Sequence, residues 1–444
     1  MSSSCQDVMP AVEELKIGKI CENIHTTSVT EAISRLEEEH FSQLFVNGGP
    51  ATGKTRFLTQ CALKWVTMGK TVVCTTPCAE AYEVFLREFE KRKTEAEWPE
   101  ALNTDGAVLN LEELEIKLMG TRNKKKSAEK KKKIFEGCKI VIGHIEHKSF
   151  LKIIRTDYWK YDGILIDDSS YLNFPHYRYI FSPKKRKDAA FVISLDIRQG
   201  KINRETSLAD DIMDQLRHNK CREEHCTKAN WTTFLQITAI SKSYYKWINH
   251  GVYGGRLKVC NNQNPGVIDF VSSTTLYKNT HQKAGQDGLN PDEAKIVVEK
   301  AEELIRAGRS PQDICILAEF VTQIDEISRL LDLSKFSKEV RVGLPIDFRW
   351  AKPIPVVIYG MTTSTQSGNW GLILLPLTSW ITVFKLAQER VVFIANPMMF
   401  TGSKYPFVRN MLKFLKGEEM EVVAPSVKNE PEEKSDDSPT TAID

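Results

Sequence analysis

A glycine-rich segment that ends in lysine and threonine is the part of the chain best suited to bind phosphate. Residues 45–58 read Phe-Val-Asn-Gly-Gly-Pro-Ala-Thr-Gly-Lys-Thr-Arg-Phe-Leu, which completes the pattern G-x-x-x-x-G-K-[ST]. In such a loop, backbone N–H groups surround the phosphates of a nucleotide at the positive end of the following helix. We therefore predict that ATP binds at this loop, through Gly48, Gly49, Pro50, Ala51, Thr52, Gly53, Lys54, Thr55 and Arg56.

The residues on either side of this loop suit a strand before it and a helix after it. Residues 43–46 form a short apolar run fit for a buried strand, and residues 56–65 are compatible with a helix. In this setting Lys54 would reach the outer phosphates and Thr55 would hold Mg²⁺. The alternative is a glycine turn without a ligand, which the complete motif and its context disfavour.

Two adjacent carboxylates follow another apolar run. Asp167 and Asp168 come directly after residues 163–166, which read Gly-Ile-Leu-Ile. A phosphate loop needs an acid on a neighbouring strand to hold Mg²⁺ and to position the attacking water. We assign Asp167 to the metal, together with Thr55, and Asp168 to the general base. Aspartates also favour the turns at strand ends, which is the alternative explanation.

A third polar strand end follows residues 191–195. It reads Asp196-Ile-Arg-Gln199. A polar side chain at this place could sense the γ-phosphate across the sheet, and we assign Gln199 as the second catalytic residue. On its own this signal is not specific.

Apolar runs alternate with helix-compatible segments along most of the chain. Further strands are expected at residues 71–74 and 139–142, and this alternation predicts a parallel sheet with its ligand at the strand carboxyl ends. A second α/β block begins with a helix from Pro291 to Ala307, whose apolar stripe and flanking Gly308 fit helix periodicity. Strands are expected after it at residues 314–317, 355–359 and 390–394.

Composition and address signals indicate an intracellular protein. Ten cysteines are scattered over 444 residues, which is typical of a reducing compartment. No run of 18 apolar residues predicts a membrane helix, and the first residues lack a secretory pattern. The basic run at residues 183–187, Pro-Lys-Lys-Arg-Lys, is of nuclear-import type and favours the nucleus slightly over the cytoplasm. A solvated loop is an equal alternative for this run.

A short cluster of histidines and cysteines resembles half of a zinc site. It comprises His218, Cys221, His225 and Cys226. His225 and Cys226 are adjacent and would not easily face one metal, and no second pair stands at a familiar distance. A polar helix that carries thiols is the favoured interpretation.

Charge is distributed unevenly along the chain. The net charge is +3, but residues 417–444 hold nine acidic residues and two lysines, a net charge of −7 that leaves +10 on the rest. A basic body with an acidic tail suits a nucleic-acid binder with a disordered end, and such a tail could also contact protein partners. No membrane partner is expected.

The order of these motifs resembles the superfamily 1 helicases, in particular the branch that contains the nonsense-mediated-decay RNA helicases. The resemblance covers roughly residues 29–400. Residues 48–55 look like that family's phosphate loop, residues 72–79 like the next motif, which touches the nucleic-acid backbone, and 195–199 like its Gly-Asp-x-x-Gln motif. Residues 167–170, Asp-Asp-Ser-Ser, stand where the family has Asp-Glu-Ala-Ser/Gln. Two further motifs of the family resemble segments of this chain, at residues 253–257 and at residues 313–320 followed by Gln323.

The resemblance implies a fold, a cofactor and a partner. The fold class would be α/β, with two tandem RecA-like phosphate-loop domains on parallel sheets and a disordered acidic tail. We expect a lead-in at residues 1–28, a first domain at 29–220, a second at 221–416 and the tail at 417–444. ATP with Mg²⁺ would be bound, and the partner would be single-stranded nucleic acid, with RNA favoured over DNA.

Several positions depart from the family pattern. Val29 is the nearest equivalent of the adenine-reading glutamine, and Asp168 replaces the catalytic glutamate. Where the family has Gln-Tyr-Arg, residues 240–245 of this chain contain no arginine. Where the family has Gln-Gly-x-Glu, residues 350–353 differ at all three specified positions. In the last motif Leu386 replaces the arginine, and Lys385 could partly compensate. Arg341, Arg349 or Arg390 could fill the gap if these segments align differently.

Three functions are open at this point. The first is a helicase-like ATPase on single-stranded nucleic acid with slow hydrolysis. The second is a catalytically weak pseudo-helicase that serves as a nucleotide-gated scaffold. The third is an unrelated phosphate-loop enzyme such as a kinase, which would leave the second α/β block unexplained.

Overall fold

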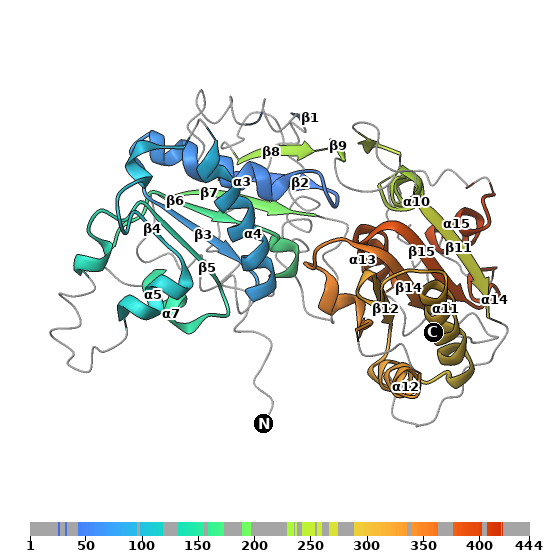
Figure 1. The fold of residues 1–444 in the computed structure, drawn as a ribbon. Coiled ribbons are helices and arrows are strands. Elements are labelled where there is room, and N and C mark those ends of the chain that lie inside the picture. The colour runs from blue at the N-terminus through green and yellow to red at the C-terminus, as the bar shows by residue number, and fades with distance from the viewer. Residues whose placement is uncertain are drawn as a thin grey trace, which may run out of the picture.

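A computed structural model shows two α/β units that lie side by side, one in the first half of the chain and one in the second (Figure 1). It describes residues 25–26, 32, 43–95, 98–118, 132–154, 159–172, 189–196, 229–234, 236–237, 242–253, 255–259, 266–273, 288–334, 339–362, 376–401, 406–418 and 420. We call residues 25–234 the first unit and residues 242–418 the second unit.

The first unit is built on an eight-stranded sheet in the order β1-β8-β2-β7-β6-β3-β5-β4. All of its pairs are parallel. The strands are β1 (His25–Thr26), β2 (Gln43–Gly48), β3 (Val72–Thr76), β4 (Val108–Leu109), β5 (Ile140–His144), β6 (Gly163–Ile166), β7 (Ala190–Leu195) and β8 (Ala229–Phe234). Because β7 lies between β2 and β6, the carboxyl ends of these three strands meet at one edge of the sheet.

Helices cover this sheet, and two of them form one wall of the site. They are α3 (Lys54–Thr67), α4 (Ala79–Lys91), α5 (Leu111–Leu118) and α7 (Lys148–Ile154), with short 3₁₀ turns η2 (Arg92–Thr94), η3 (Glu100–Leu102) and η4 (Ser169–Tyr171). Apolar residues of α3 such as Phe57, Leu58 and Cys61 are fully buried against the strands. Burial of this face is the main force that holds α3 on the sheet.

The second unit is built on a five-stranded parallel sheet in the order β11-β15-β14-β12-β13. Its strands are β11 (Val267–Ser272), β12 (Ile314–Ala318), β13 (Arg341–Gly343), β14 (Ile354–Gly360) and β15 (Ala387–Ala395). A separate two-stranded pair joins β9 (Gln236–Ile237) to β10 (Lys258–Val259). The helices are α10 (Lys242–Val252), α11 (Pro291–Arg306), α12 (Val321–Asp332), α13 (Pro376–Leu386), α14 (Met398–Thr401) and α15 (Pro406–Leu415), with 3₁₀ turns η7 (Pro311–Asp313) and η8 (Pro345–Phe348).

Aromatic side chains fill one side of the second sheet. Trp247, Trp380 and Phe384 are fully buried there and contact one another edge-on or tilted. The other side is aliphatic, with Val297 of α11 and Ile327 of α12 against Ile316. Coverage of both faces explains why the strands of this sheet are apolar runs.

The predicted fold class is confirmed: the chain is α/β, with two tandem RecA-like units on parallel sheets. The domain limits stay a prediction, but β8 pairs with β2 in the first sheet. The predicted boundary between residues 220 and 221 places β8 in the second domain, whereas its strand partner β2 is in the first. Of the predicted tail at 417–444, residues 419 and 421–444 lie outside the described residues.

Candidate active site

The glycine-rich loop joins β2 to α3 and curls around the amine of Lys54. Lys54 Nζ donates to the backbone carbonyls of Gly48 at 2.7 Å and Gly49 at 2.9 Å. Gly53 precedes α3 in the left-handed region, with φ 89°, and Ala51 has φ 57°. No side chain caps the first turn of α3. The first turn of α3 holds no acidic residue of its own, and the positive end of this helix faces the loop.

Close packing explains two of the glycines. A Cβ atom on Gly48 would lie 2.4 Å from Thr52 Oγ1, and the Thr52 hydroxyl donates to the Gly49 carbonyl at 2.9 Å. A Cβ atom on Gly49 would lie 3.1 Å from the ring of Tyr253, which follows α10 in the second unit. The loop is thus packed from inside by its own threonine and from outside by the second unit.

Asp167 lies beside the loop and bonds to Thr55. Thr55 Oγ1 donates to Asp167 Oδ2 at 2.7 Å, and Ser194 Oγ donates to Asp167 Oδ1 at 2.7 Å. Asp167 is 4% exposed. Burial and the neighbouring Asp168 raise the pKa of Asp167, while its bonds to Ser194 and Thr55 and the charge of Lys54 act in the opposite direction. Both oxygens are thus held by hydroxyl groups.

These oxygens suit a hard divalent cation. The hydroxyl comes from the first turn of α3 and the carboxylate from the end of β6. Oxygen ligands of these types are those that Mg²⁺ takes, with water and substrate phosphates completing its shell. The residues therefore fit the predicted metal, with Thr55 and Asp167 as the two protein ligands. Among the described residues there is no cluster of three or more His, Cys, Asp or Glu side chains that could hold a metal on its own.

Asp168 is fixed through both its backbone and its side chain. Its φ is 51°, a left-handed conformation that is uncommon outside glycine, and its N–H donates to Ser194 Oγ at 3.0 Å. Trp350 of the second unit donates from Nε1 to Asp168 Oδ2 at 2.8 Å. The side chain predicted to be the base is therefore held by a residue almost two hundred positions away.

A cavity of about 960 Å³ opens at these side chains, between the two units. Its lining combines residues 50–56 of the loop with Asp167, Asp168 and Asp196 from the strand ends. Residues 349–353 and part of α13 line it from the second unit. This volume lies in the range of small-molecule sites.

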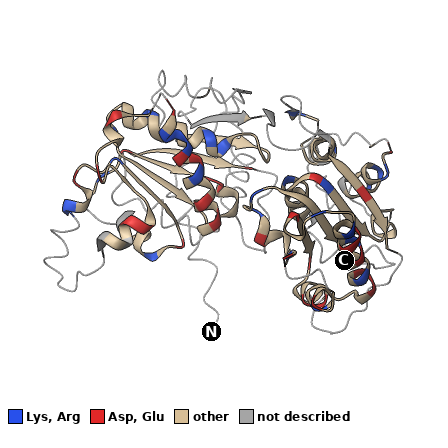
Figure 2. Ribbon diagram, viewed as in Figure 1, with Lys and Arg blue, Asp and Glu red and all other residues tan. Residues whose placement is uncertain are grey.

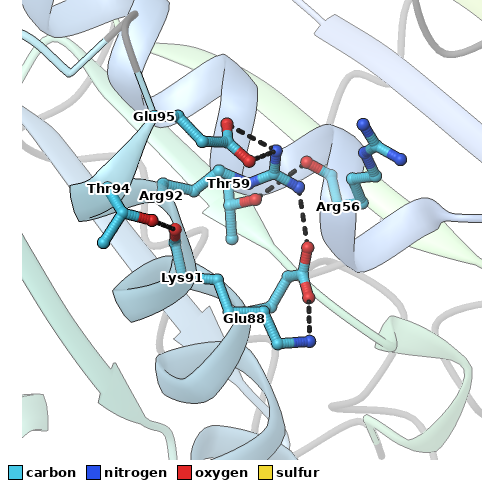
Figure 3. A network of polar contacts seen from close by, with 7 residues as sticks. All are labelled: Arg56, Thr59, Glu88, Lys91, Arg92, Thr94 and Glu95. Carbon is cyan, nitrogen blue, oxygen red and sulfur yellow. Dashed lines mark hydrogen bonds and ion pairs between the residues drawn. The ribbon is translucent and has the colours of Figure 1, made fainter.

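A charged face of α4 forms another wall of the cavity (Figure 3). Arg92 is 3% exposed and donates to both carboxylate oxygens of Glu95 at 2.8 Å and to Glu88 at 2.7 Å. Lys91 also pairs with Glu88, at 3.1 Å. Arg56 of α3 lies near this network with an exposed side chain. The buried guanidinium fixes the end of α4 through paired rather than isolated charges.

The second unit brings three basic residues to the cavity, Arg349, Lys352 and Lys385. The Arg349 guanidinium carbon lies 3.7 Å from the ring centre of Tyr171, and the residue is 8% exposed. Lys385 Nζ donates to the Arg349 carbonyl at 3.2 Å, and burial lowers the pKa of Lys385. Two of the residues named from the sequence as possible replacements for the missing arginine, Arg349 and Lys385, thus line the cavity.

The alternatives for that charge can now be separated. Leu386 is 2% exposed and lies in the apolar core. Arg341 donates to the Gln312 carbonyl at 3.0 Å, and Arg390 pairs with Asp269 at 3.4 Å. Of the three arginines considered, Arg349 is the one that lines the cavity. It belongs to a segment whose motif is altered, which is why the motif comparison alone did not single it out.

The predicted site residues come together, with one exception outside the described residues. Residues 50–56, Asp167 and Asp168 line the cavity, and Gly48 and Gly49 hold the Lys54 amine. Gln199, the basic run at 183–187 and the cluster at 218–226 lie outside the described residues. The sequence assigned no site role to Ser194, Tyr253 or Trp350. Ser194 stands two residues before Asp196 on a predicted strand, which could have signalled it.

No protein-family model and no curated protein sequence matches the chain. Among solved structures, the arterivirus nonstructural protein 10 helicase with DNA matches at 9% identity, with a TM-score of 0.40, over 80% of this chain and 61% of that one. Mss116p bound to ssRNA and AMP-PNP matches at 11% identity, with a TM-score of 0.43, over 88% of this chain and 75% of that one. The helicase domain of Pyrococcus furiosus Hef matches at 9% identity, with a TM-score of 0.41, over 84% of this chain and 95% of that one.

These similarities concern the fold alone, and superpositions this loose carry no argument about activity. The chain spans about 61% of the arterivirus helicase chain. Within the described part of the chain, no helix has both the length and the apolar character that crossing a membrane requires.

Proposed function

We propose that the chain binds Mg²⁺–ATP in the cavity between the two units and hydrolyses it slowly, as a helicase-like protein that acts on single-stranded nucleic acid. The observation that carries the proposal is the 2.7 Å bond from Thr55 Oγ1 to Asp167 Oδ2. It joins the phosphate loop to the acidic strand end across 111 intervening residues, beside the amine of Lys54. RNA is favoured over DNA as partner.

Each residue then has a defined task. Lys54 and the N–H groups of the loop would bind the β- and γ-phosphates, with Arg349 and Lys385 adding charge from the second unit. Mg²⁺, held by Thr55 and Asp167, would neutralise charge on the phosphate oxygens. Asp168 would accept one proton from water as the water oxygen bonds to the γ-phosphorus. The bridging P–O bond breaks, and ADP leaves with its electron pair.

The proposed slowness has a structural reason. Asp168 is one methylene shorter than the glutamate that the resembled family uses, so it reaches less far towards a water. Arg349 stacks on Tyr171 at 3.7 Å, and a guanidinium held in this way has to be shared between the ring and a phosphate. Both features reduce transition-state stabilisation more than binding.

The nucleic-acid partner is proposed from the motifs that resemble the helicase family. Residues 72–79, which resemble a backbone-contacting motif, form β3 and the start of α4. The turn between them, at Pro77 and Cys78, is at the carboxyl edge of the first sheet, the edge that also carries the phosphate loop. A strand bound there would be close to the nucleotide, and phosphate contacts would give affinity without sequence preference.

The test is a phosphate-release assay on the full chain, with and without single-stranded RNA and DNA, beside a fluorescent-duplex unwinding assay. We expect Mg²⁺-dependent release that single strands increase and that Lys54→Ala abolishes, with weak or absent unwinding. No release above the Lys54→Ala background would remove hydrolysis from the proposal. Robust ATP-driven unwinding would contradict the proposed slowness.

A second candidate, a nucleotide-gated scaffold without turnover, is favoured by one observation. Oδ2 of Asp168 already accepts a hydrogen bond from Trp350. If that bond blocked water activation, ATP would bind and remain intact. Nucleotide recovered unhydrolysed from a saturated, Mg²⁺-containing complex would support this candidate.

A further inference from the structure

Trp350 brings a hydrogen-bond donor from the second unit to the side chain that we assign as the general base. The bond runs from indole Nε1 to Asp168 Oδ2 at 2.8 Å. The position lies in the segment that departs most from the pattern of the resembled family, and nothing in that pattern assigns a role to a tryptophan there. The contact therefore needs an explanation of its own.

The surroundings of Trp350 hold its ring in one orientation. Its ring meets that of Tyr171 edge-on, with 5.7 Å between centres and 82° between planes. The Arg349 guanidinium lies 5.3 Å from the Trp350 ring and 3.7 Å from Tyr171, so it bridges the two aromatics. Behind them, the Lys385 amine donates to the Arg349 carbonyl. Edge-on aromatic pairs and cation–π contacts each favour one geometry of the rings.

The backbone on both sides is also fixed. η8 ends directly before Arg349, and Ala351 N donates to the Phe348 carbonyl at 3.0 Å, which closes the turn that carries Trp350. On the other side, Ser194 Oγ accepts the Asp168 N–H at 3.0 Å. The Asp168 side chain torsions are what remains adjustable, and the indole bond fixes them.

The chemistry of the bond suits a base. An indole N–H is a donor only and cannot remove the proton that the carboxylate must accept. The bond engages Oδ2, so Trp350 leaves Oδ1 of the same carboxylate to a water. A short aspartate has few ways to reach a water, and loss of orientation is costly in a proton-transfer step.

We propose that Trp350 is a positioning residue that orients Asp168 for hydrolysis, so that turnover requires the second unit to be seated on the first. This role rests on the proposed hydrolytic function. Because Trp350 belongs to the second unit, catalysis then requires that unit to be packed against the first. The second unit contributes this indole donor in addition to any charge that it supplies. Arg349 and Tyr171 act on this bond indirectly, by holding the ring.

The first experiment measures steady-state phosphate release by Trp350→Phe. Phenylalanine keeps an aromatic ring beside Tyr171 and removes the donor. A hydrogen bond to a charged group contributes roughly 1.5–3 kcal/mol, so we expect kcat to fall about 10- to 100-fold. KM for ATP should stay within about twofold, because the bond orients the base rather than the nucleotide.

Trp98→Phe is the matched control. Its indole also donates to a side-chain oxygen, Asn103 Oδ1 at 3.1 Å, and Trp98 does not line the cavity. This variant should keep the kcat of the wild type. Trp350→His, which retains a ring N–H donor, should recover part of the lost kcat, whereas a purely structural role would predict no such recovery.

The second experiment observes the bond without turnover. The indole N–H resonance of Trp350, identified by its loss in Trp350→Phe, should move and exchange faster with solvent in Asp168→Ala, while that of Trp98 stays in place. A kcat that is unchanged or raised by Trp350→Phe would overturn the positioning role, and so would an indole resonance that ignores Asp168. If the wild type releases no phosphate, the proposed hydrolytic function is overturned instead. The indole resonance would then still show whether Trp350 contacts Asp168.

Discussion

Arg349 stacks its guanidinium on Tyr171 and lines the cavity together with Lys54 and Asp168. If Arg349 stabilises charge on the transferred phosphoryl group, the Arg349→Ala variant should have a kcat at least about tenfold lower. The decrease should be smaller than the roughly 10³- to 10⁵-fold change in kcat that arginine fingers contribute elsewhere. Arg349→Lys should restore little of this loss, because an ammonium lacks the planar fork.

Steady-state phosphate release measures the effect of Arg349. Arg341→Ala is its control, since Arg341 bonds to the Gln312 carbonyl on the surface of the second unit. Equal kcat values for Arg349→Ala and Arg341→Ala would show that the charge does not come from residue 349.

Asp167 is the proposed Mg²⁺ ligand, and its removal tests the metal directly. Asp167→Asn keeps the size of the side chain and an oxygen that can accept from Thr55, but it removes the negative charge. We expect the Mg²⁺ concentration for half-maximal ATP binding to rise at least about tenfold. Asp105→Asn, an exposed aspartate of the same unit, should leave this concentration unchanged. An unchanged Mg²⁺ requirement in Asp167→Asn would remove Asp167 from the metal site.

At this scale, the residues that sequence could identify are those that form a contiguous motif. The phosphate loop and the aspartate pair are recognisable because each stands at the end of its own apolar run. Trp350, Tyr253 and Ser194 reach the site through tertiary packing, and no motif assigned any of the three side chains a role there. Arg349 was one of three candidates, and only the fold separates it from Arg341 and Arg390.

The packing of α3 on β6 sets the distance between the phosphate loop and the aspartates. A Cβ atom on Gly163 would lie 2.1 Å from Cζ3 of Trp65, which is 3% exposed on α3. Gly163→Ala should therefore lower the free energy of unfolding by about 1–3 kcal/mol, as overpacking does. Thermal unfolding measures the loss. Trp65→Leu removes the clashing ring, so Gly163→Ala should lower the free energy of unfolding clearly less in the Trp65→Leu variant than in the wild type. If the losses of the two single variants simply add up in the double variant, the predicted clash is contradicted.

Glu293 ties α11 to the end of β14 and makes stability depend on pH. Its Oε1 accepts the Thr362 N–H at 2.6 Å, and burial raises its pKa to about 8. The carboxyl is neutral in the folded chain up to that pH but ionises near pH 4.5 when unfolded. Its contribution to stability is therefore complete below pH 4.5 and is lost as pH rises through about 8.

Glu293→Gln removes this titration and keeps an oxygen for Thr362. Relative to the wild type, the variant should gain roughly 4 kcal/mol between pH 4.5 and pH 8.5, measured by urea unfolding. The neighbouring Tyr359 has a pKa raised well above this window by burial, so it does not contribute. The interpretation of Glu293 as a buried neutral carboxyl would be contradicted if the variant and the wild type differed in free energy of unfolding by the same amount at both pH values.

Elements were predictable where a buried strand forms one apolar run. Residues 163–166 are buried throughout β6, and the runs at 314–317 and 355–359 became β12 and β14 with shifts of about one residue. β8 was missed because Ala-Asn-Trp-Thr-Thr-Phe mixes polar and apolar residues, although it pairs with β2 over six residues. β11 was missed too, since its ends are exposed.

At the scale of the whole molecule, contacts between the units concentrate at the site. Tyr253 donates to Asp196 Oδ2 at 2.5 Å, Trp350 to Asp168, and Ala51 of the loop packs against the core of the second unit. Basic and acidic residues alternate along α4 and α11 instead of forming one-signed faces (Figure 2). The described contacts between the units are thus hydrogen bonds and apolar packing around the cavity.

We propose above all that this cavity holds Mg²⁺–ATP through the phosphate loop. The most direct measurement is equilibrium binding of a fluorescent ATP analogue to the full chain, in wild type, Lys54→Ala and the control Lys64→Ala on the same helix. We predict Mg²⁺-dependent binding that Lys54→Ala weakens roughly 10- to 100-fold and Lys64→Ala leaves unchanged, with all three proteins unfolding at similar temperatures. Equal affinity of wild type and Lys54→Ala would contradict nucleotide binding at the phosphate loop.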